Sequence, residues 1–391
     1  MEFIYRRSCE TLIVQRNFAP VSELGEAINV NSIEGEILDD FSAGVYIRNG
    51  SNPLSGGLKS TKSIFGSSSH TWIEGEGMLH AIYIDKDSDG RWIVRYNNIH
   101  VETKTYKQEK QRNKPSFLPA IEGDPLAIFV NLRFGAMNKL ISNINVFEQG
   151  GKFYLIAENH IPQEINIFTL ETLGNWNADR HWNHPFTSHP KRALGTRELV
   201  IMGVDAVKAF MELGIISDDM KKLIHKADLK LDRCSLCLEI GVTQRLALIQ
   251  FNKKDYARIG TMPHYGDGCT FHIRNCFEDG DEVVVRGCKT LESIIRGPDF
   301  GLDKFQCNFT GLKNRCGYTQ VVDSSASSIS GMPKYGGLAK LYLDQLRIGI
   351  SSKENQFEDA IKLEYHEFGE NIFCNGAAFV LSENGSKEDD G

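Results

Sequence analysis

The feature that most constrains this chain is the recurrence of short strand-like segments along its whole length. Each is four to seven residues long, rich in β-branched and aromatic residues, and bounded by Gly, Asn, Asp or Pro. Such a pattern predicts a sandwich, a barrel or a propeller, and so an all-β fold. No exact repeat is visible, so a blade period of about 40–50 residues is compatible with the spacing but not established by it. The predicted strands are 45–49, 79–84, 91–96, 152–158, 164–170, 281–287, 318–322, 340–343 and 377–381.

Helical periodicity is confined to a few places. Residues 203–213 (GVDAVKAFMEL) and 217–227 (SDDMKKLIHKA) predict two helices that lie over the β body. Asp218 and Asp219 would then occupy the first turn of the second helix, where the helix dipole favours acidic side chains.

Composition limits the partners and the compartment. Lys and Arg total 44 and Asp and Glu total 51, a net charge of −7, so there is no basic surplus and no nucleic-acid partner is expected. No apolar run approaches the roughly 18 residues that a transmembrane span requires, and residues 1–10 have no apolar signal core. The nine scattered cysteines fit reduced thiols. We therefore expect a cytoplasmic protein, with a plastid address left open if the true N-terminus is longer.

The histidines offer the clearest chemistry. His181, His184 and His189 lie within nine residues, a density that suits a metal site, but their irregular, Pro-containing stretch does not place two rings on one helical face. A β-rich interaction module with zinc at these three residues is one interpretation. His272 alternates with Phe271 and Ile273 in a predicted strand, so it is either a core histidine or a ligand directed at a central axis.

Seven ordered blocks resemble the carotenoid cleavage dioxygenase family, and most closely its plant members, such as the 9,10 cleavage dioxygenases. The likeness runs in order from about Asn17 to Gly391. The blocks are VYIRNGSNPL (45–54), HTWIEGEGMLHAIYI (70–84), TLETLG (169–174), FTSHPK (186–191), FHIRNCFEDGDEVVV (271–285), FTGLKNRCGYTQVV (309–322) and EDDG (388–391).

This resemblance implies a fold and a reaction. The family folds as a seven-bladed β-propeller with a small helical dome, which predicts a single domain over residues 1–391. Four histidines from different blades hold one non-haem Fe(2+), leaving coordination positions for dioxygen. The implied reaction cleaves one C=C bond of a carotenoid or apocarotenoid into two carbonyl products, without an organic cofactor. Peripheral contact with a membrane is left open.

The resemblance also implies roles for individual residues. The first iron ligand lies in the family's Ser/Ala-His-Pro-Lys motif, here at His189, and the third in its Phe-His-x-x-Asn motif, here at His272. Glu158 matches a carboxylate that accepts an imidazole N–H and orients that ligand. His181 and His184 then become local structure rather than ligands.

Two departures from the family pattern concern the same metal site. The second ligand should begin a His-Asp/Glu-x-x-x-Thr-Glu pattern, but the corresponding stretch reads LEIGVTQ, with Leu238 in the place of the imidazole. The fourth ligand lies beyond EDDG in the family, where this chain has ended. We therefore expect weak or absent iron occupancy, incomplete last blades and a domain truncated at its C-terminus. The alternative function is a catalytically impaired, shortened family member with at most an apolar-ligand or partner-binding role.

Overall fold

The protein is described by a computed structural model. It describes residues 20–54, 60–63, 66–69, 75–113, 116–117, 139–157, 160–176, 182, 186–193, 195–204, 210–230, 247–250, 258–261, 269–279, 282–290, 303–304, 313–323, 325–326, 334–343, 362–374 and 376–391. At 204, 210–211 and 229–230, and within 60–69, 247–261, 269–290 and 303–304, it describes the backbone alone. Glu158, Leu238 at the predicted second ligand position, His181 and His184 lie outside these residues.

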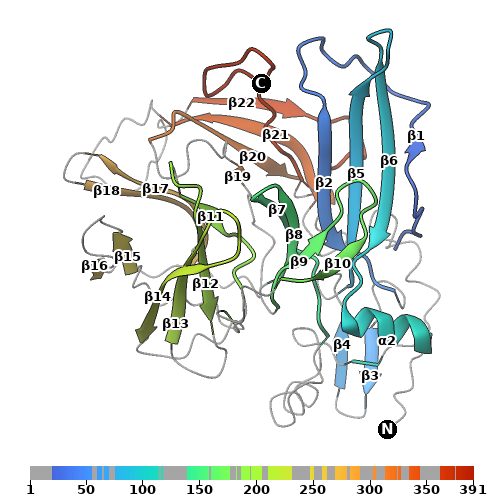
Figure 1. The fold of residues 1–391 in the computed structure, drawn as a ribbon. Helices are drawn as coiled ribbons and strands as arrows, with labels where there is room; N and C mark the ends of the chain where they lie inside the picture. The colour runs from blue at the N-terminus through green and yellow to red at the C-terminus, as the bar shows by residue number, and fades with distance from the viewer. Residues whose placement is uncertain are drawn as a thin grey trace.

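The described strands form antiparallel sheets that follow one another around the molecule in chain order (Figure 1). We name the four sheets of four strands the first, second, third and last blades. The first blade has the order β1(Ile28–Asn29)-β6(Trp92–His100)-β5(Gly77–Lys86)-β2(Gly44–Ser51), and the second is β10(Thr172–Asn175)-β9(Gln163–Ile165)-β8(Lys152–Ile156)-β7(Asn145–Gln149). The third is β11(Lys191–Arg192)-β12(Leu199–Val204)-β13(Phe210–Ile216)-β14(Leu223–Lys230), and the last is β19(Asp303–Lys304)-β20(Cys316–Val322)-β21(Tyr335–Tyr342)-β22(Lys362–Glu367).

Three two-stranded sheets complete the described strands: β3(Ser60–Ser63) with β4(Gly66–Ser69), β15(Ala247–Gln250) with β16(Arg258–Thr261), and β17(Cys269–Asp279) with β18(Glu282–Thr290). One α-helix, α2 (Lys104–Arg112), occurs among the described residues. An all-β, propeller-like fold with few helices is therefore confirmed. The count of seven blades and the helical dome stay predictions.

The blades pack face to face through two apolar clusters. Between the first and second blades lie Leu79, Ala81, Tyr83, Val101, Leu155, Ile165 and Leu170, with Val45 and Ile47 packed against them. Between the second and third lie Tyr154, Ile156, Trp176, Trp182, Phe186, Leu199, Ile201, Ile216 and Met220. Burial of each such side chain contributes roughly 1.5–3 kcal/mol, so these two interfaces hold neighbouring blades in place.

The two predicted helices are wrong. Residues 203–213 cover the end of β12 and the start of β13, and residues 217–227 form a turn followed by β14. The side chains from Leu223 to Asp228 alternate between half-buried and exposed, which is the period of a strand. Asp219 accepts hydrogen bonds from the Ser217 hydroxyl (2.6 Å) and the Lys221 N–H (3.1 Å), so it stabilises the β13–β14 turn and not a helix end.

Helix α2 was not predicted, because its sequence, KTYKQEKQR, shows almost no apolar periodicity. Its ends carry ordinary capping signals. The Thr103 side chain accepts the Tyr106 N–H at its start, and Asn113 adopts a left-handed conformation (φ 50°) at its end. Tyr106 and Glu109 are buried on its inner side, so tertiary contacts stabilise the helix more than its own pattern does.

The segment 376–391 closes the ring between the last and first blades. The predicted strand at 377–381 is wrong, because these residues are described without strand structure. The Ser42 hydroxyl donates to the Leu381 carbonyl (2.9 Å), and the Glu383 N–H donates to the Asp40 carbonyl (3.0 Å). Backbone and side-chain hydrogen bonds therefore replace strand pairing at this closure.

Replacing Glu388 by alanine should loosen this closure. The Glu388 carboxylate accepts the backbone N–H of Arg315 (2.7 and 3.0 Å) and of Cys316 (2.8 Å) at the start of β20. Hydrogen bonds to a charged acceptor are worth about 1.5–3 kcal/mol, so we expect Glu388→Ala to lower the free energy of unfolding by about that amount in a urea titration. Glu383→Ala is the control, because Glu383 joins the closure through its backbone. Equal losses in both variants would contradict the assignment.

Candidate functional site

His189 lies where the second and third blades meet. It follows the fully buried Ser188 and precedes β11, the first strand of the third blade. Asn145, the first residue of β7, donates from its amide to the Ser188 carbonyl at 2.8 Å. The His189 N–H donates to the Thr187 hydroxyl at 3.3 Å, and the His189 side chain is exposed. Asn145 thus ties the histidine-bearing loop to the first strand of the neighbouring blade, a contact for which the sequence pattern carries no signal.

His272 lies in β17, paired with Cys288 of β18. The register of this hairpin shifts between Thr270 and His272 and again between Ile273 and Asn275. Such bulges bend a strand and re-aim its side chains, and they are frequent beside active sites. The structure describes the backbone of His272 only, so its side chain is not placed relative to His189.

The four-imidazole iron site implied by the resemblance sets a clear requirement for the donor groups. Among the residues whose side chains the structure describes, no group of three or more His, Cys, Asp or Glu is close enough to hold a metal ion. The side chain of His272 and the positions of Glu158 and Leu238 lie outside the described side chains, so the metal site implied by the resemblance stays a prediction.

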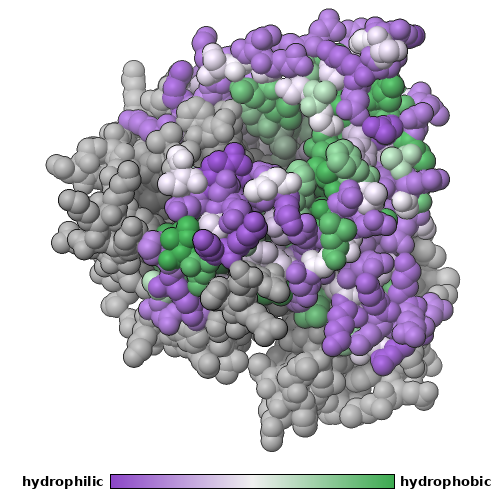
Figure 2. Space-filling model, viewed as in Figure 1, coloured by the Kyte–Doolittle hydropathy of each residue, from purple (hydrophilic) through white to green (hydrophobic). Residues whose placement is uncertain are grey.

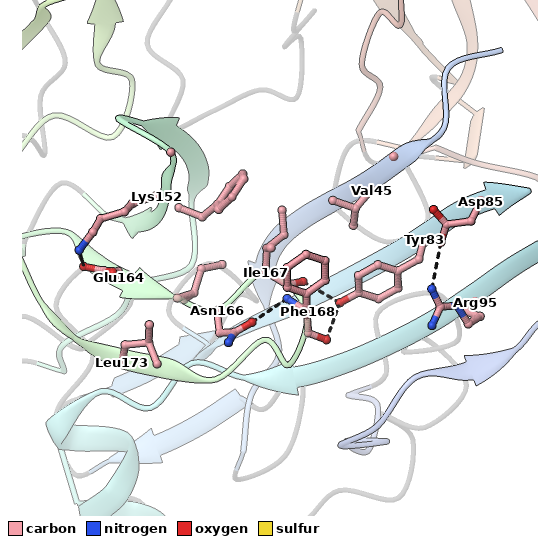
Figure 3. A pocket seen from close by; sticks show the side chains of 14 residues that line it. Val45, Tyr83, Asp85, Arg95, Lys152, Glu164, Asn166, Ile167, Phe168 and Leu173 are labelled. Carbon is pink, nitrogen blue, oxygen red and sulfur yellow. Dashed lines mark hydrogen bonds and ion pairs between the residues drawn. The ribbon is translucent and has the colours of Figure 1, made fainter. Parts of the chain in front are cut away.

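An open pocket of about 540 Å³ lies between the first and second blades (Figure 3). Its apolar lining comes from Val45 of β2 and from Phe153, Ile165, Ile167, Phe168 and Leu173 of the second blade. Phe168 is 78% exposed and Leu173 is 58% exposed. Figure 2 shows apolar side chains gathered between these two sheets on the same face of the molecule. The pocket is open to solvent, so it presents this apolar lining at the surface between the two blades.

A rigid turn presents Phe168 at the edge of this pocket. The Asn166 side chain accepts the N–H of Phe168 (2.8 Å) and of Thr169 (3.2 Å), and Leu170 is buried with φ 63°. The Tyr83 hydroxyl of β5 donates to the Ile167 and Phe168 carbonyls at 2.9 and 3.2 Å. The predicted strand at 164–170 therefore ends at Ile165, because these side chains stabilise a turn instead.

The charges around the pocket neutralise one another. Lys152 pairs with Glu164 at 2.9 Å on one side, and Arg95 pairs with Asp85 at 2.9 Å on the other (Figure 3). Burial raises the pKa of Tyr83, with Arg95 opposing that shift, so the phenol is neutral at pH 7. The pocket therefore offers no net charge to a ligand, which favours a neutral, apolar occupant.

Comparisons with known proteins give one consistent result. Residues 18–253 match the family described as retinal pigment epithelial membrane protein. The chain is 24% identical to carotenoid 9,10(9',10')-cleavage dioxygenase 1 of Pisum sativum, over 70% of this chain and 56% of that protein. It is also 24% identical to the Arabidopsis thaliana protein of the same name, over 96% of this chain and 80% of that protein.

Solved structures agree with the fold. Cobalt-substituted apocarotenoid oxygenase of Synechocystis is similar with a TM-score of 0.68 and 15% identity, over 93% of this chain and 85% of that one. Lignostilbene dioxygenase of Pseudomonas brassicacearum is similar with a TM-score of 0.58 and 16% identity, over 83% of this chain and 80% of that one. At these identities the likeness establishes the fold. The aligned region spans 56–59% of the length of the first three curated relatives.

Proposed function

The chain belongs to the retinal pigment epithelial membrane protein family, which includes the carotenoid cleavage dioxygenases, and on that premise we propose that it is an oxygenase of carotenoids or apocarotenoids. The observation that carries the proposal is the family match over residues 18–253, which contains four of the seven motif blocks and the first three blades. In the overall reaction one dioxygen molecule cleaves one C=C bond, and each carbon of that bond receives one oxygen atom, which gives two carbonyl products. No helix among the described residues is long and apolar enough to cross a bilayer.

The finer features of the family belong to the same proposal. The chain would form one seven-bladed domain over residues 1–391, with a small helical dome above the axis. His189 and His272 would contribute imidazoles to Fe(2+), which supplies the activation of dioxygen in this family, and Glu158 would accept an imidazole N–H. Asn145 supports this assignment, because its hydrogen bond to Ser188 fixes the backbone beside His189.

A second candidate function is the binding of an apolar ligand, or of a partner, without turnover. Leu238 favours it, because each missing imidazole removes a metal bond and the pre-organisation that accompanies it. The neutral, apolar pocket between the first and second blades is compatible with such a role. The two candidates share a ligand class and differ in iron content and product release.

Restoring the missing ligand separates the two candidates. We expect Leu238→His to bind more iron per chain than the wild type after reconstitution with Fe(2+), because it returns an imidazole to the second ligand position. The measurements are metal analysis of the purified chain and oxygen-dependent loss of carotenoid or apocarotenoid absorbance, with carbonyl products identified by mass spectrometry. An anaerobic sample controls for non-enzymatic bleaching.

The outcomes are distinct. Stoichiometric iron in the wild type, with bleaching that His189→Ala abolishes, would support the oxygenase. A folded wild type that binds the polyene without iron or products, in which His189→Ala changes nothing, would support the binding role. If Leu238→His gains no iron while remaining folded, the alignment of Leu238 with the second ligand is wrong.

A further inference from the structure

The two faces of the first blade differ in chemistry. Because side chains alternate along β2, Val45 and Ile47 face the apolar cluster shared with the second blade, whereas Tyr46 and Arg48 face the opposite way. On that side lies the closing segment. A Cβ placed on Gly376 would stand 3.2 Å from the Tyr46 hydroxyl and 3.5 Å from Cδ of Arg48. Figure 1 shows the last blade returning to β2 at this point.

Arg48 is a partly buried cation without a partner in the part of the chain that the structure describes. No hydrogen bond or ion pair connects its guanidinium to another described residue. Burial lowers the pKa of Arg48, and the electrostatic contribution that opposes this shift comes from Tyr46, which is a neutral phenol at pH 7. By contrast, Arg95 and Arg192 pair with Asp85 and Glu148 at 2.9 and 2.6 Å, although they are partly exposed.

A desolvated charge is costly unless an opposite charge or hydrogen-bond acceptors compensate it. None of the described neighbours of Arg48 supplies an opposite charge. His80, which pairs with Arg48 across β2 and β5, binds the Tyr96 hydroxyl through Nδ1 at 2.7 Å. Burial, followed by the nearby Arg48, lowers the pKa of His80 to about 4, so its ring is neutral at pH 7. Among the described residues at this site, nothing therefore compensates the positive charge of Arg48.

The surroundings of the Arg48 guanidinium limit which anion could balance its charge. A Cβ on Gly50 would stand 3.1 Å from a terminal nitrogen of Arg48, and Gly376 lies along its stem, so two residues without side chains border the group. The planar fork of a guanidinium matches a carboxylate through two parallel hydrogen bonds. One positive charge balances one carboxylate, whereas a phosphate dianion would leave a net negative charge in a partly buried site.

We propose that Arg48, between the first blade and the closing segment, is the anchor of a binding site for a small monocarboxylate. The site does not depend on the proposed oxygenase function, since none of its residues belongs to the predicted metal site or to the pocket of Figure 3. Occupancy would strengthen the ring closure, because the ligand would supply the charge that the protein lacks between two blades.

The test is thermal unfolding of the full chain at pH 7 in sodium acetate and in sodium chloride of equal ionic strength. Acetate should raise the wild-type midpoint saturably, by roughly 2 °C at ten times its Kd. Arg48→Met should lose this response, and in chloride its midpoint should equal or exceed that of the wild type, because an uncompensated charge has been removed. Arg48→Lys should respond more weakly than the wild type, because it keeps the charge without the planar fork.

Arg91→Met is the matched control, since Arg91 lies on the exposed β5–β6 turn with 75% of its side chain accessible. It should respond to acetate as the wild type does. An equal response in all variants, or an Arg48→Met midpoint lower by the same amount in both salts, would overturn the proposal.

Two further measurements cover the remaining cases. If Arg48→Met fails to fold, calorimetric titration of the wild type decides, with one saturable acetate site per chain supporting the proposal and none overturning it. Sedimentation distinguishes the source of the carboxylate. A monomer that binds acetate supports a small ligand, whereas a dimer that acetate or Arg48→Lys dissociates shows that an acidic side chain of a second copy occupies the site instead.

Discussion

Replacing Gly77 by alanine is expected to prevent stable folding of the first blade. A Cβ at this position would overlap the carbonyl oxygen of Ser142 and stand 3.0 Å from a methyl group of Val101. The Ser142 carbonyl cannot move freely, because it accepts the Asn49 amide at 2.8 Å. Overpacking typically costs about 1–3 kcal/mol and occasionally more, and the backbone carbonyl in the way at Gly77 places this substitution at the upper end of that range, at about 3 kcal/mol. We expect at least that loss in the free energy of unfolding, measured by urea titration of the soluble chain.

Gly44→Ala is the matched control for this result. Gly44 begins β2, and a Cβ there would meet no atom within 4 Å. Its φ is not positive, so alanine should leave stability unchanged or raise it by a few tenths of a kcal/mol through the unfolded state. A Gly77→Ala protein as stable as Gly44→Ala would show that the chain can separate residues 77 and 142 at no cost, contrary to the packing described above.

Replacing Lys139 by methionine should have the second large effect. Lys139 forms ion pairs with Glu76 and, at 3.1 Å, with Glu109, two carboxylates that are 3% and 1% exposed. The Leu54 N–H also donates to Glu76 (2.7 Å), and the Ser116 N–H to Glu109 (2.8 Å). Removing the cation leaves two buried acids without their counter-ion, which costs roughly 3–5 kcal/mol in the free energy of unfolding at pH 7.

The pKa shifts of Glu76 and Glu109 predict how this loss in the free energy of unfolding depends on pH. Burial raises the pKa of Glu76, but Lys139 together with the hydrogen bonds donated by Glu109 and by the Leu54 N–H more than offsets this shift. Burial, and the hydrogen bond that Glu109 donates to Glu76, leave the pKa of Glu109 raised. Without Lys139, both folded-state pKa values lie above the unfolded value, so the folded state binds more protons and gains stability as the pH falls. Lowering the pH from 7 to 5 should therefore narrow the gap between Lys139→Met and the wild type.

Lys152→Met is the control for the charge change. Lys152 pairs with Glu164 at 2.9 Å and is 55% exposed, so its loss should cost about 0–1 kcal/mol with little pH dependence over the same range. If Lys139→Met shows a loss as small as this, the buried cluster is compensated by some other group and the assignment of Lys139 is wrong.

Much of the fold was predictable because the strands carry their own signals. The segments at 45–49, 79–84 and 318–322 lie within β2, β5 and β20, where β-branched and aromatic residues alternate between turn residues. The pair of predicted helices failed for a tertiary reason. Lys, Asp and Leu at a nearly helical spacing also fit an antiparallel pair, and the burial of Ile216 in the cluster between the second and third blades favours strands.

The candidate site was less accessible to sequence reasoning. The motif around His189 identified a loop, but its anchor, Asn145, comes from another blade, 43 residues away from Ser188. Contacts of this kind depend on the order in which blades follow one another, which no local pattern encodes. Likewise, Phe168 and Tyr83 meet only because the second blade packs on the first. The predicted roles of His272, Glu158 and Leu238 stay predictions, because the structure does not describe their side chains.

The closing segment has a mechanical consequence. Apolar clusters hold the first three blades together. Among the described residues, the closing segment is linked to the first blade by the hydrogen bonds that Ser42 and Glu383 donate, and to the last blade by the hydrogen bonds that Glu388 accepts and by the contact of Phe379 with Tyr318. Hydrogen bonds at a wet boundary exchange readily with water, so the seam can open while every sheet stays intact. Among the blade interfaces that the structure describes, the seam between the last blade and the first is therefore where we expect unfolding to begin.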